Sequence, residues 1–273
     1  KLVSEGYDIF DVIRSATINP STHYGLEAGL LREGDIADFI VADSIEEMNI
    51  LETWINGKKV YDRGRILFRY EPGKSINIFN CSEINEEDLI IENKGHKFRM
   101  IKAYDGELLT TGEVHQKIGG RIIKPYPEKD ILKIVVKDRY NDAPPAIGLI
   151  RGFGIRKGAF ASSVAHDSHN IIAIGTNDSD IVSVINEIVR LKGGLAVSAD
   201  NNTTSVQLDI AGIMSTKDCV EIATSYEKLN NRVKEMGCKM SAPFMTLSFM
   251  ALLVIPELKI SDRGLFDSKG FKH

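Results

Sequence analysis

The segment from Ser162 to Asn170 is the part of this sequence whose side chains point most directly to chemistry. It reads Ser-Ser-Val-Ala-His-Asp-Ser-His-Asn and sets two imidazoles, a carboxylate, hydroxyls and a carboxamide against the apolar run 171–174. A polar cluster at the entry to a buried strand costs free energy unless it is hydrogen-bonded or used. Histidine titrates near neutrality, so one imidazole is a candidate proton shuttle. The candidate catalytic residues are His166, Asp167, Ser168 and His169, and the candidate binding residues from this segment are His169 and Asn170.

Two other interpretations of this cluster stay open. In a structural one, Asp167 orients an imidazole, and Ser168 or Asn170 satisfies loose backbone groups. In a metal-binding one, the two histidines have to share a face, as residues three apart do on a helix but not on a strand. Because the β-rich run 171–174 follows at once, we expect a loop or strand entry here and no metal site in this chain.

A glycine-rich segment, Gly152 to Gly158, precedes the cluster and carries the cations Arg156 and Lys157. We expect its donors and positive charge to converge with the histidines at the start of one strand, which makes Lys157 a further candidate binding residue. The segment lacks the Gly-Lys-Ser/Thr ending of a phosphate-binding loop and the full dinucleotide spacing, and no long helix follows it. Nucleotide phosphate is therefore a disfavoured ligand, and the two cations are alternatively surface charges.

The composition limits what the chain can be. Of its 273 residues, 43% are hydrophobic and 26% charged, the balance of a soluble globular protein with one or two domains. A net charge of -4 without a basic stripe argues against a nucleic-acid partner. The longest strongly apolar segment, Phe244 to Ile255, is too short to cross a membrane and is expected in the core. Three cysteines without paired spacing fit a reducing, cytoplasmic compartment.

Hydropathy patterns predict a β-rich first part of the chain. A short helix over 7–16 is expected to stop at Asn19-Pro20, because the residue before a proline avoids helical geometry. Short β-type runs over 37–61, with the turn pair Asn56-Gly57, predict a small antiparallel sheet.

The texture then changes to strands alternating with helices, which predicts an α/β arrangement. The expected elements are a strand at 131–137, a strand at 171–174, a helix at 178–192, a strand at 195–199 and a helix that ends at Met236 before Gly237. Asn177 or Asp178 is expected to cap the first helix, and Ser215 with Asp218 resembles a capping box for the second.

Several motifs carry a resemblance to a known family. Ala16-Thr17-Ile18-Asn19-Pro20 and the following Gly29 to Val41 resemble the end of an amidohydrolase-superfamily enzyme, where the last helix of a metal-dependent barrel returns the chain to a small β-sandwich. Four later segments narrow the resemblance to the bacterial and archaeal adenine deaminase family, namely Gly152 to Ala159, Ser163 to Ile171, Ala211 to Ser215 and Ile255 to Leu258. The paired-cysteine signature of the cytidine-type zinc deaminases is absent.

This resemblance implies hydrolysis of adenine to hypoxanthine and ammonia by a metal-activated hydroxide. It implies a binuclear centre of manganese or iron, with ligands on barrel strands that match no residue of this chain. We therefore expect the catalytic centre upstream of Lys1 and no activity from this chain alone. The cluster His166 to Asn170 is then either a contribution to the barrel mouth or a structural element. Adenine is the expected partner, with no nucleic acid or membrane, in a homo-oligomer.

The expected fold class is mixed, with a small β-sandwich portion followed by an α/β (α+β) C-terminal domain. Residues 1–18 are expected to be the last helix of a TIM barrel mostly missing from this chain, 19–115 the sandwich portion and connector, and 116–273 the C-terminal domain. Two alternatives remain. One is a non-catalytic small-molecule-binding domain or a dimerisation domain that pairs subunits through the 216–236 helix, and the other is an amidohydrolase of different specificity.

Overall fold

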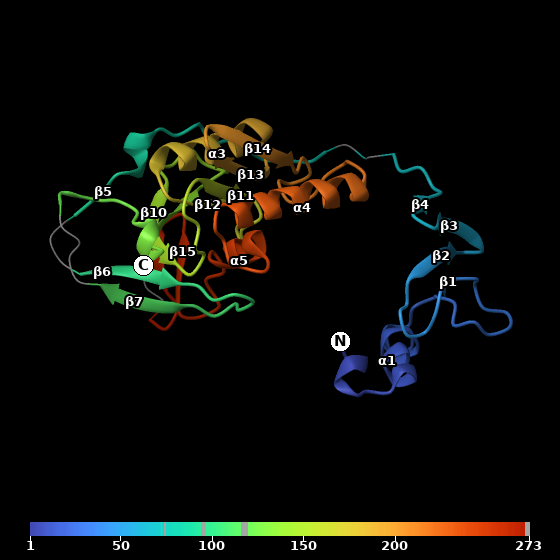
Figure 1. Cartoon of the computed structure of the whole chain (residues 1–273). Helices are drawn as coiled ribbons and strands as arrows, with labels where there is room; N and C mark the ends of the chain where they lie inside the picture. Colours follow the sequence, from blue (N-terminus) through green and yellow to red (C-terminus); the bar gives the residue numbers. More distant parts are fainter. Residues whose placement is uncertain (72, 74, 94–96, 116–119, 271–273) are drawn as a thin grey trace. The chain divides into compact units, whose positions relative to one another are not determined.

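The structure is a computed structural model that describes residues 1–71, 73, 75–93, 97–115 and 120–270 (Figure 1). The chain divides into two compact units, residues 1–71 and 72–273, and each is described by itself. Among the described residues, no helix combines the length and the apolar character needed to cross a lipid bilayer.

The first unit holds short helices and one antiparallel sheet with the strand order β1-β2-β3-β4. The turn from β2 to β3 is made by Asn56 and Gly57, both with positive φ, as a tight hairpin turn of this kind requires. The predicted sheet and its Asn-Gly turn are confirmed. The elements are a 3₁₀ helix (Val3–Glu5), α1 (Ile9–Ala16), α2 (Ile18–Tyr24), β1 (Phe39–Ala42), β2 (Ile50–Ile55), β3 (Lys58–Asp62) and β4 (Arg65–Ile66).

Helix α1 confirms the helix predicted over 7–16. Its N-cap residue Asp8 accepts hydrogen bonds from the backbone N–H groups of Phe10 and Asp11. The predicted stop at Asn19-Pro20 is wrong, because both residues lie inside α2. Pro20 is the third residue of α2, where a backbone N–H has no intrahelical acceptor to lose.

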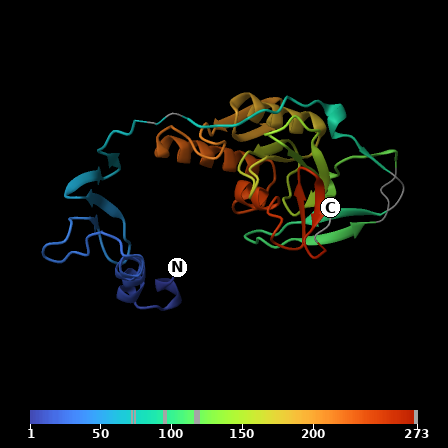
Figure 2. The same cartoon turned by 180° about the vertical axis from the view of Figure 1, so that it is seen from behind.

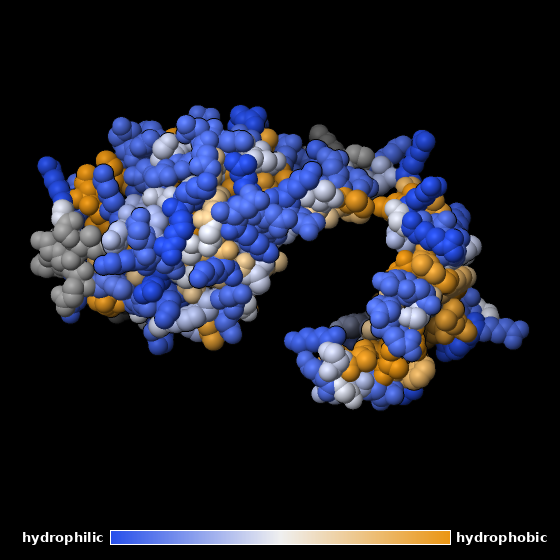
Figure 3. Space-filling model, in the orientation of Figure 1, coloured by the Kyte–Doolittle hydropathy of each residue, from blue (hydrophilic) through white to orange (hydrophobic). Residues whose placement is uncertain are grey.

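The first unit has no hydrophobic core within residues 1–71. None of its residues is buried, and large apolar side chains such as Phe10, Leu31 and Ile55 are exposed. Exposed apolar side chains of this kind appear orange in Figure 3. Within these residues the expected β-sandwich portion consists of one four-stranded sheet.

The second unit is built on an eight-stranded mixed sheet with the order β14-β13-β11-β12-β9-β10-β6-β7. All neighbours pair antiparallel except β10 and β6, which are parallel. The sheet strands are β6 (Phe98–Lys102), β7 (Thr111–His115), β9 (Leu132–Lys137), β10 (Ala146–Arg151), β11 (Ala159–Ser162), β12 (Ile171–Gly175), β13 (Gly194–Ala199) and β14 (Asn202–Gln207).

Helices cover both faces of this sheet, as the two views in Figures 1 and 2 show. Helix α3 (Asp178–Leu191) buries Ile181, Val184, Ile185 and Ile188 in one apolar cluster with strand residues. Helices α4 (Cys219–Glu235) and α5 (Pro243–Phe249) contribute to the cluster on the other face. The remaining elements are 3₁₀ helices (Glu86–Leu89 and Pro127–Lys129), β5 (Ile91–Glu92), β8 (Ile122–Ile123), β15 (Leu258–Ser261) and β16 (Gly264–Asp267).

The strongly patterned segments are confirmed as predicted. Strands β9, β12 and β13 are buried along their whole length, which explains why apolar residues predominate in them. The side chain of Asn177 caps α3 by accepting from the Asp180 N–H. The capping box expected at Ser215 is shifted, because Asp218 itself is the N-cap of α4 and accepts from the first-turn N–H groups.

The compact units divide after Glu71, and the domain boundary expected near residue 115 stays a prediction. Strands β6 and β7 belong to the eight-stranded sheet because β6 pairs in parallel with β10. Leu89, on the expected connector, is fully buried in the cluster under α3. A parallel pairing between strands so far apart in sequence leaves no local signal in the chain.

Candidate functional site

The histidine loop, residues 163–170, connects β11 to β12 at one end of the sheet. The two strands pair antiparallel, with Ser162 opposite Ile172, so the loop spans the turn between neighbouring strands. It is irregular, with a turn at 166–168. The predicted loop conformation before β12 is confirmed, and the two histidines do not share a helix face.

His166 is held against helix α5. Its ring stacks on Phe249 with centroids 4.9 Å apart and planes 20° from parallel. Its backbone N–H donates to the carbonyl oxygen of Ser248 over 3.1 Å. The ring of His169 meets it edge to face, with a centroid distance of 5.4 Å. The loop therefore presents two adjacent imidazoles, one of them backed by an aromatic ring.

His169 occupies a partly buried, electrostatically positive position. Burial lowers its pKa below the usual value of 6.5, and the nearby His166 and Arg139 add to that effect. Asp167 acts in the opposite direction. The Nδ1 atom of His169 is buried and has no hydrogen-bond partner. The lowered pKa favours the neutral imidazole of His169, and its Nδ1 is a buried polar atom that the described residues leave unsatisfied.

The other loop residues divide into exposed and structural ones. Asp167 and Ser168 are exposed, and within the described residues no hydrogen bond joins the Asp167 carboxylate to an imidazole. The backbone carbonyl of Ser168, not its hydroxyl, accepts a 2.9 Å hydrogen bond from Tyr140. Asn170 is buried, and its Oδ1 accepts from the N–H of Arg139 over 3.2 Å. Asn170 is therefore a structural residue in this state.

Arg139 ties the loop to two other segments, and the sequence analysis missed it. Its side chain is 4% exposed and donates to the carbonyl oxygen of Ala211 over 2.7 Å and to the hydroxyl of Tyr140 over 2.8 Å. The guanidinium carbon lies 5.4 Å from the ring centroid of Phe79 and 4.7 Å from that of Tyr140. Among the described residues no carboxylate forms an ion pair with it, and its Nε has no partner.

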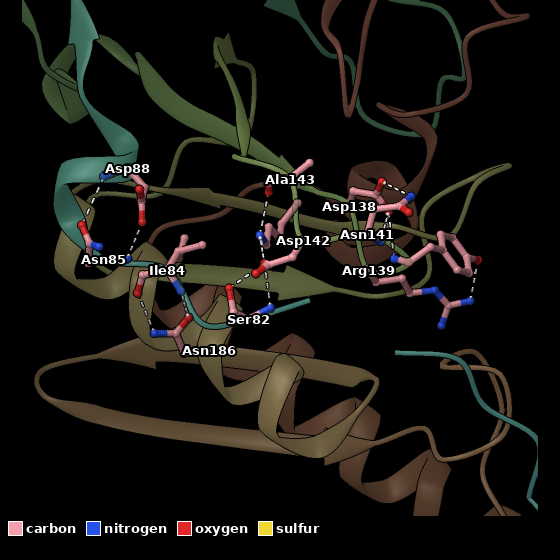
Figure 4. A network of polar contacts seen from close by, with 12 residues as sticks. Ser82, Ile84, Asn85, Asp88, Asp138, Arg139, Asn141, Asp142, Ala143 and Asn186 are labelled. Carbon is pink, nitrogen blue, oxygen red and sulfur yellow. Dashed lines mark hydrogen bonds and ion pairs between the residues drawn. The ribbon is translucent and has the colours of Figure 1, made fainter. Parts of the chain in front are cut away.

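The turn after β9 that carries Arg139 is held by its own polar network (Figure 4). The carboxylate of Asp138 accepts from the N–H of Tyr140 over 2.8 Å. Asp142 accepts from both the N–H and the hydroxyl of Ser82, over 3.0 and 2.6 Å. These hydrogen bonds hold the pKa of the Asp142 carboxyl at about 2. The network fixes the position of Arg139.

Ser163 connects the loop to the turn at 210–214. Its hydroxyl donates to the carbonyl oxygen of Gly212 over 2.5 Å and accepts from the N–H of Gly194 over 2.8 Å. Gly212 has φ +69, and a Cβ added there would lie 2.2 Å from Nη1 of Arg139. The segments Ser163 to Ile171 and Ala211 to Ser215, which carry the family resemblance, thus meet at Arg139.

Lys157 does not join the histidines, contrary to the expectation. It precedes β11 whereas the histidine loop follows it, so the strand lies between them. Its ammonium pairs with Asp200 at 2.6 Å, and both side chains are exposed. The backbone donors of the glycine-rich segment are also occupied, because the Asp130 carboxylate accepts from the N–H groups of Gly152 and Gly154, each over 2.7 Å. A protein carboxylate therefore occupies the place that an anion would take.

A cavity of about 540 Å³ opens beside the histidine loop. Helices α4 and α5, strands β13 and β14 and the turn at 213–215 form its walls. Two residues connect it to the loop, because Val164 and Ser248 both line the cavity. Its lining is mostly apolar and comprises Ser162, Val164, Leu195, Val206, Leu208, Ile213, Met214, Ser215, Lys217, Cys219, Ile222, Ala223, Tyr226, Phe244, Met245 and Ser248.

The residues described here do not fit a metal centre. Among them, no three His, Cys, Asp or Glu side chains gather closely enough to hold an ion. The two histidines of the loop have an exposed carboxylate, Asp167, as their nearest sequence neighbour and no third ligand. No chemical step is therefore assigned to a metal held by this part of the chain.

Two families of known proteins match parts of this chain. Residues 2–60 match the family described as Amidohydrolase family, which is the class of the first unit. Residues 108–272, more than half of the sequence, match the family described as Adenine deaminase C-terminal domain. The chain belongs to this second family, and the resemblance seen in its motifs is confirmed.

Curated relatives of the chain carry the name adenine deaminase. The chain is 47% identical over 98% of its length to the protein of that name from Methanosarcina barkeri. It is 46% identical over 99% of its length to that of a Sulfurovum species and 42% identical over its full length to that of Salinibacter ruber. The chain spans about half the length of these relatives.

Proposed function

We propose that this chain is the C-terminal part of an adenine deaminase, which hydrolyses adenine to hypoxanthine and ammonia. The observation that carries the proposal is an identity of 41–47% with proteins of that name over 98% or more of the chain. Because the chain spans half of their length, the activity is proposed for the complete polypeptide. The chain alone is expected to be inactive.

The reaction exchanges one bond to a ring carbon for another. A water oxygen bonds to the carbon that carries the amino group, the carbon–nitrogen bond breaks, and the nitrogen leaves as ammonia with a proton that came from water. Such a reaction needs groups that accept and return a proton near neutral pH. It also needs donors and acceptors for the ring nitrogens of a neutral purine.

The histidine loop has the groups that this chemistry uses. Burial lowers the pKa of His169 and favours its neutral imidazole, a form that has one donor and one acceptor nitrogen and so suits hydrogen bonds with a neutral heterocycle. The ring of His166 lies flat on Phe249, which fixes the plane in which it contacts a ligand. We assign this loop to the wall of the adenine site in the complete enzyme.

The metal of the complete enzyme belongs to the same proposal. Manganese or iron is the proposed ion, held by residues other than those described here. A homo-oligomer and a cytoplasmic location stay predictions. The alternative in which subunits pair through the 216–236 helix also stays a prediction, and the exposed face of α4 carries many charged side chains.

The test follows ammonia release from adenine, with added manganese, by this chain and by the complete polypeptide. Only the complete polypeptide is expected to turn adenine over. In it, His169→Gln is expected to lower kcat/KM by about 10²-fold or more. Lys157→Ala, at the other end of β11, is the matched control and is expected to change kcat/KM by less than about twofold.

Each negative result has its own meaning. A folded complete polypeptide that releases no ammonia from adenine contradicts the proposed substrate and leaves an amidohydrolase of different specificity. A complete enzyme in which His169→Gln matches the wild type assigns the histidine loop to a structural role only.

A further inference from the structure

The cavity beside the histidine loop opens at a rim of exposed apolar side chains. Met214 and Met245 both line the cavity, and they are 55% and 51% exposed. Val220, the neighbour of the lining residue Cys219, is 58% exposed. An exposed apolar rim that continues into an apolar cavity is unusual on the solvent-exposed surface of a monomeric protein and marks an interaction site. Methionines suit such a site because their side chains adapt to a partner.

The interior of the cavity offers few groups to a polar ligand. The hydroxyl of Ser162 accepts from the N–H of Val164 over 2.9 Å. The hydroxyl of Ser248 donates to the carbonyl oxygen of Met245 over 2.7 Å. At the rim, Lys217 is paired with Glu221 at 2.6 Å. The hydroxyl of Ser215 accepts from the N–H of Lys217, which leaves the hydroxyl of Tyr226 without a hydrogen bond among the described lining residues. A purine would therefore leave most of its own donors and acceptors unmatched here, whereas apolar side chains have none to satisfy.

The cavity shares a wall with the histidine loop. Helix α5 presents Met245 and Ser248 to the cavity, and its last residue, Phe249, supports the ring of His166. The carbonyl oxygen of Ser248 also accepts from the backbone N–H of His166. A partner bound at the cavity mouth would therefore contact α5, the short helix that also positions the histidine loop.

We propose that this cavity mouth docks apolar side chains of the other half of the deaminase polypeptide. The inference rests on the proposed function, because that half is the part assigned to catalysis. The relatives supply the occupant, because the chain covers about half of their length and the other half of a relative is the part that this chain does not match. Docking there brings the histidine loop to the catalytic part.

A natural thiol reports on the docking. Cys219 lines the cavity and is exposed, Cys81 is intermediate and Cys238 is buried. Iodoacetamide labelling, with each site followed by mass spectrometry, compares this chain with the complete polypeptide. Cys219 is expected to react about tenfold more slowly or less in the complete polypeptide, because a covered thiol reacts only when its cover opens. Cys238 is the internal control and is expected to stay slow in both.

A charge at the rim is expected to undo the docking. In the complete polypeptide, Met245→Glu and, independently, Met214→Glu are expected to return Cys219 labelling to within about twofold of the rate in this chain. Both side chains are half exposed, so the fold of the second unit tolerates the change. Val114→Glu is the matched control. Val114 is 62% exposed and lies on β7, at the opposite edge of the sheet from β14.

Three results would overturn the inference. Equal Cys219 labelling in the two polypeptides means that nothing covers the mouth. Protection already present in this chain, and lost on dilution, means that a second copy is the occupant. Protection that survives both rim variants means that other contacts cover Cys219. Adenine turnover, measured on the same samples, fails or succeeds independently of the labelling and so separates this inference from the proposed function.

Discussion

The imidazole of His166 lies nearly parallel to the ring of Phe249, with their centroids 4.9 Å apart. The two residues belong to elements far apart in sequence, the loop after β11 and the last residue of α5. The contact links a loop rich in polar groups to a helix whose other residues are mostly buried. This stack adds to the hydrogen bonds of Ser163 and Asn170 in holding the loop in place.

The stack predicts a measurable coupling. A double-mutant cycle with His166→Leu and Phe249→Leu is expected to give an interaction energy of about 0.5–1.5 kcal/mol, the usual size for a stacked aromatic pair. The measurement is denaturant unfolding of this chain and its three variants. Strictly additive losses would show that the two rings are neighbours without being energetically linked.

Gly212 is expected to tolerate no side chain. Gly212→Ala forces a Cβ to within 2.2 Å of Nη1 of Arg139 at a φ of +69, so a loss of about 2–4 kcal/mol in unfolding free energy is expected from strain and displacement of the guanidinium. Gly106→Ala is the control, because Gly106 has φ +71 and open space around its Cβ position. It is expected to cost about 1 kcal/mol. Equal losses for the two variants would refute the role given to Arg139.

His169 predicts a loss of stability on mild acidification. Its pKa is lowered in the folded state, chiefly by burial, from 6.5, so below that pH the unfolded chain binds the proton first. The free energy of unfolding therefore falls as the pH drops from about 6.5 through the lowered folded pKa. Chemical unfolding across this range, compared with His169→Gln, is expected to show a steeper fall in the wild type. His23→Gln, in the first unit, serves as the control, and parallel curves for wild type and His169→Gln would contradict the prediction.

The buried Lys259 leads us to expect a change in the free energy of unfolding at alkaline pH. It is fully buried, donates to the carbonyl oxygens of Leu108 and Phe249 over 2.6 and 3.1 Å, and burial lowers its pKa from 10.5 to about 8. Between these values the unfolded chain holds the extra proton, so stability contributed by this group rises from pH 8 to pH 10.5. Lys259→Met is expected to lose this rise, measured as the difference between two unfolding curves. A difference that stays constant with pH would show that Lys259 does not titrate in this window.

Local patterns were enough to predict three strands and two helices of the second unit, β9, β12, β13, α3 and α4. A buried strand needs apolar side chains along its length, and an amphipathic helix needs them at helical spacing. Both patterns can be recognised from neighbouring residues, as in β9, β12 and α3. The same holds for the loop conformation before β12. Errors arose where a local rule had an exception, as at Pro20 inside the first turn of α2.

The sequence by itself determined the family, the main strands and helices, and the identity of the polar cluster at His166 to Asn170. Only the tertiary structure decided which residues distant in the sequence are in contact. The segment Ala159–Ser162 forms strand β11, which separates Lys157 from the histidines, and β11 lies between β12 and β13. The carboxylate of Asp130 accepts hydrogen bonds from the glycine-rich segment. The physical reason is that periodicity and turn chemistry act between near neighbours, whereas strand order and the burial of Arg139 depend on contacts between residues distant in the chain.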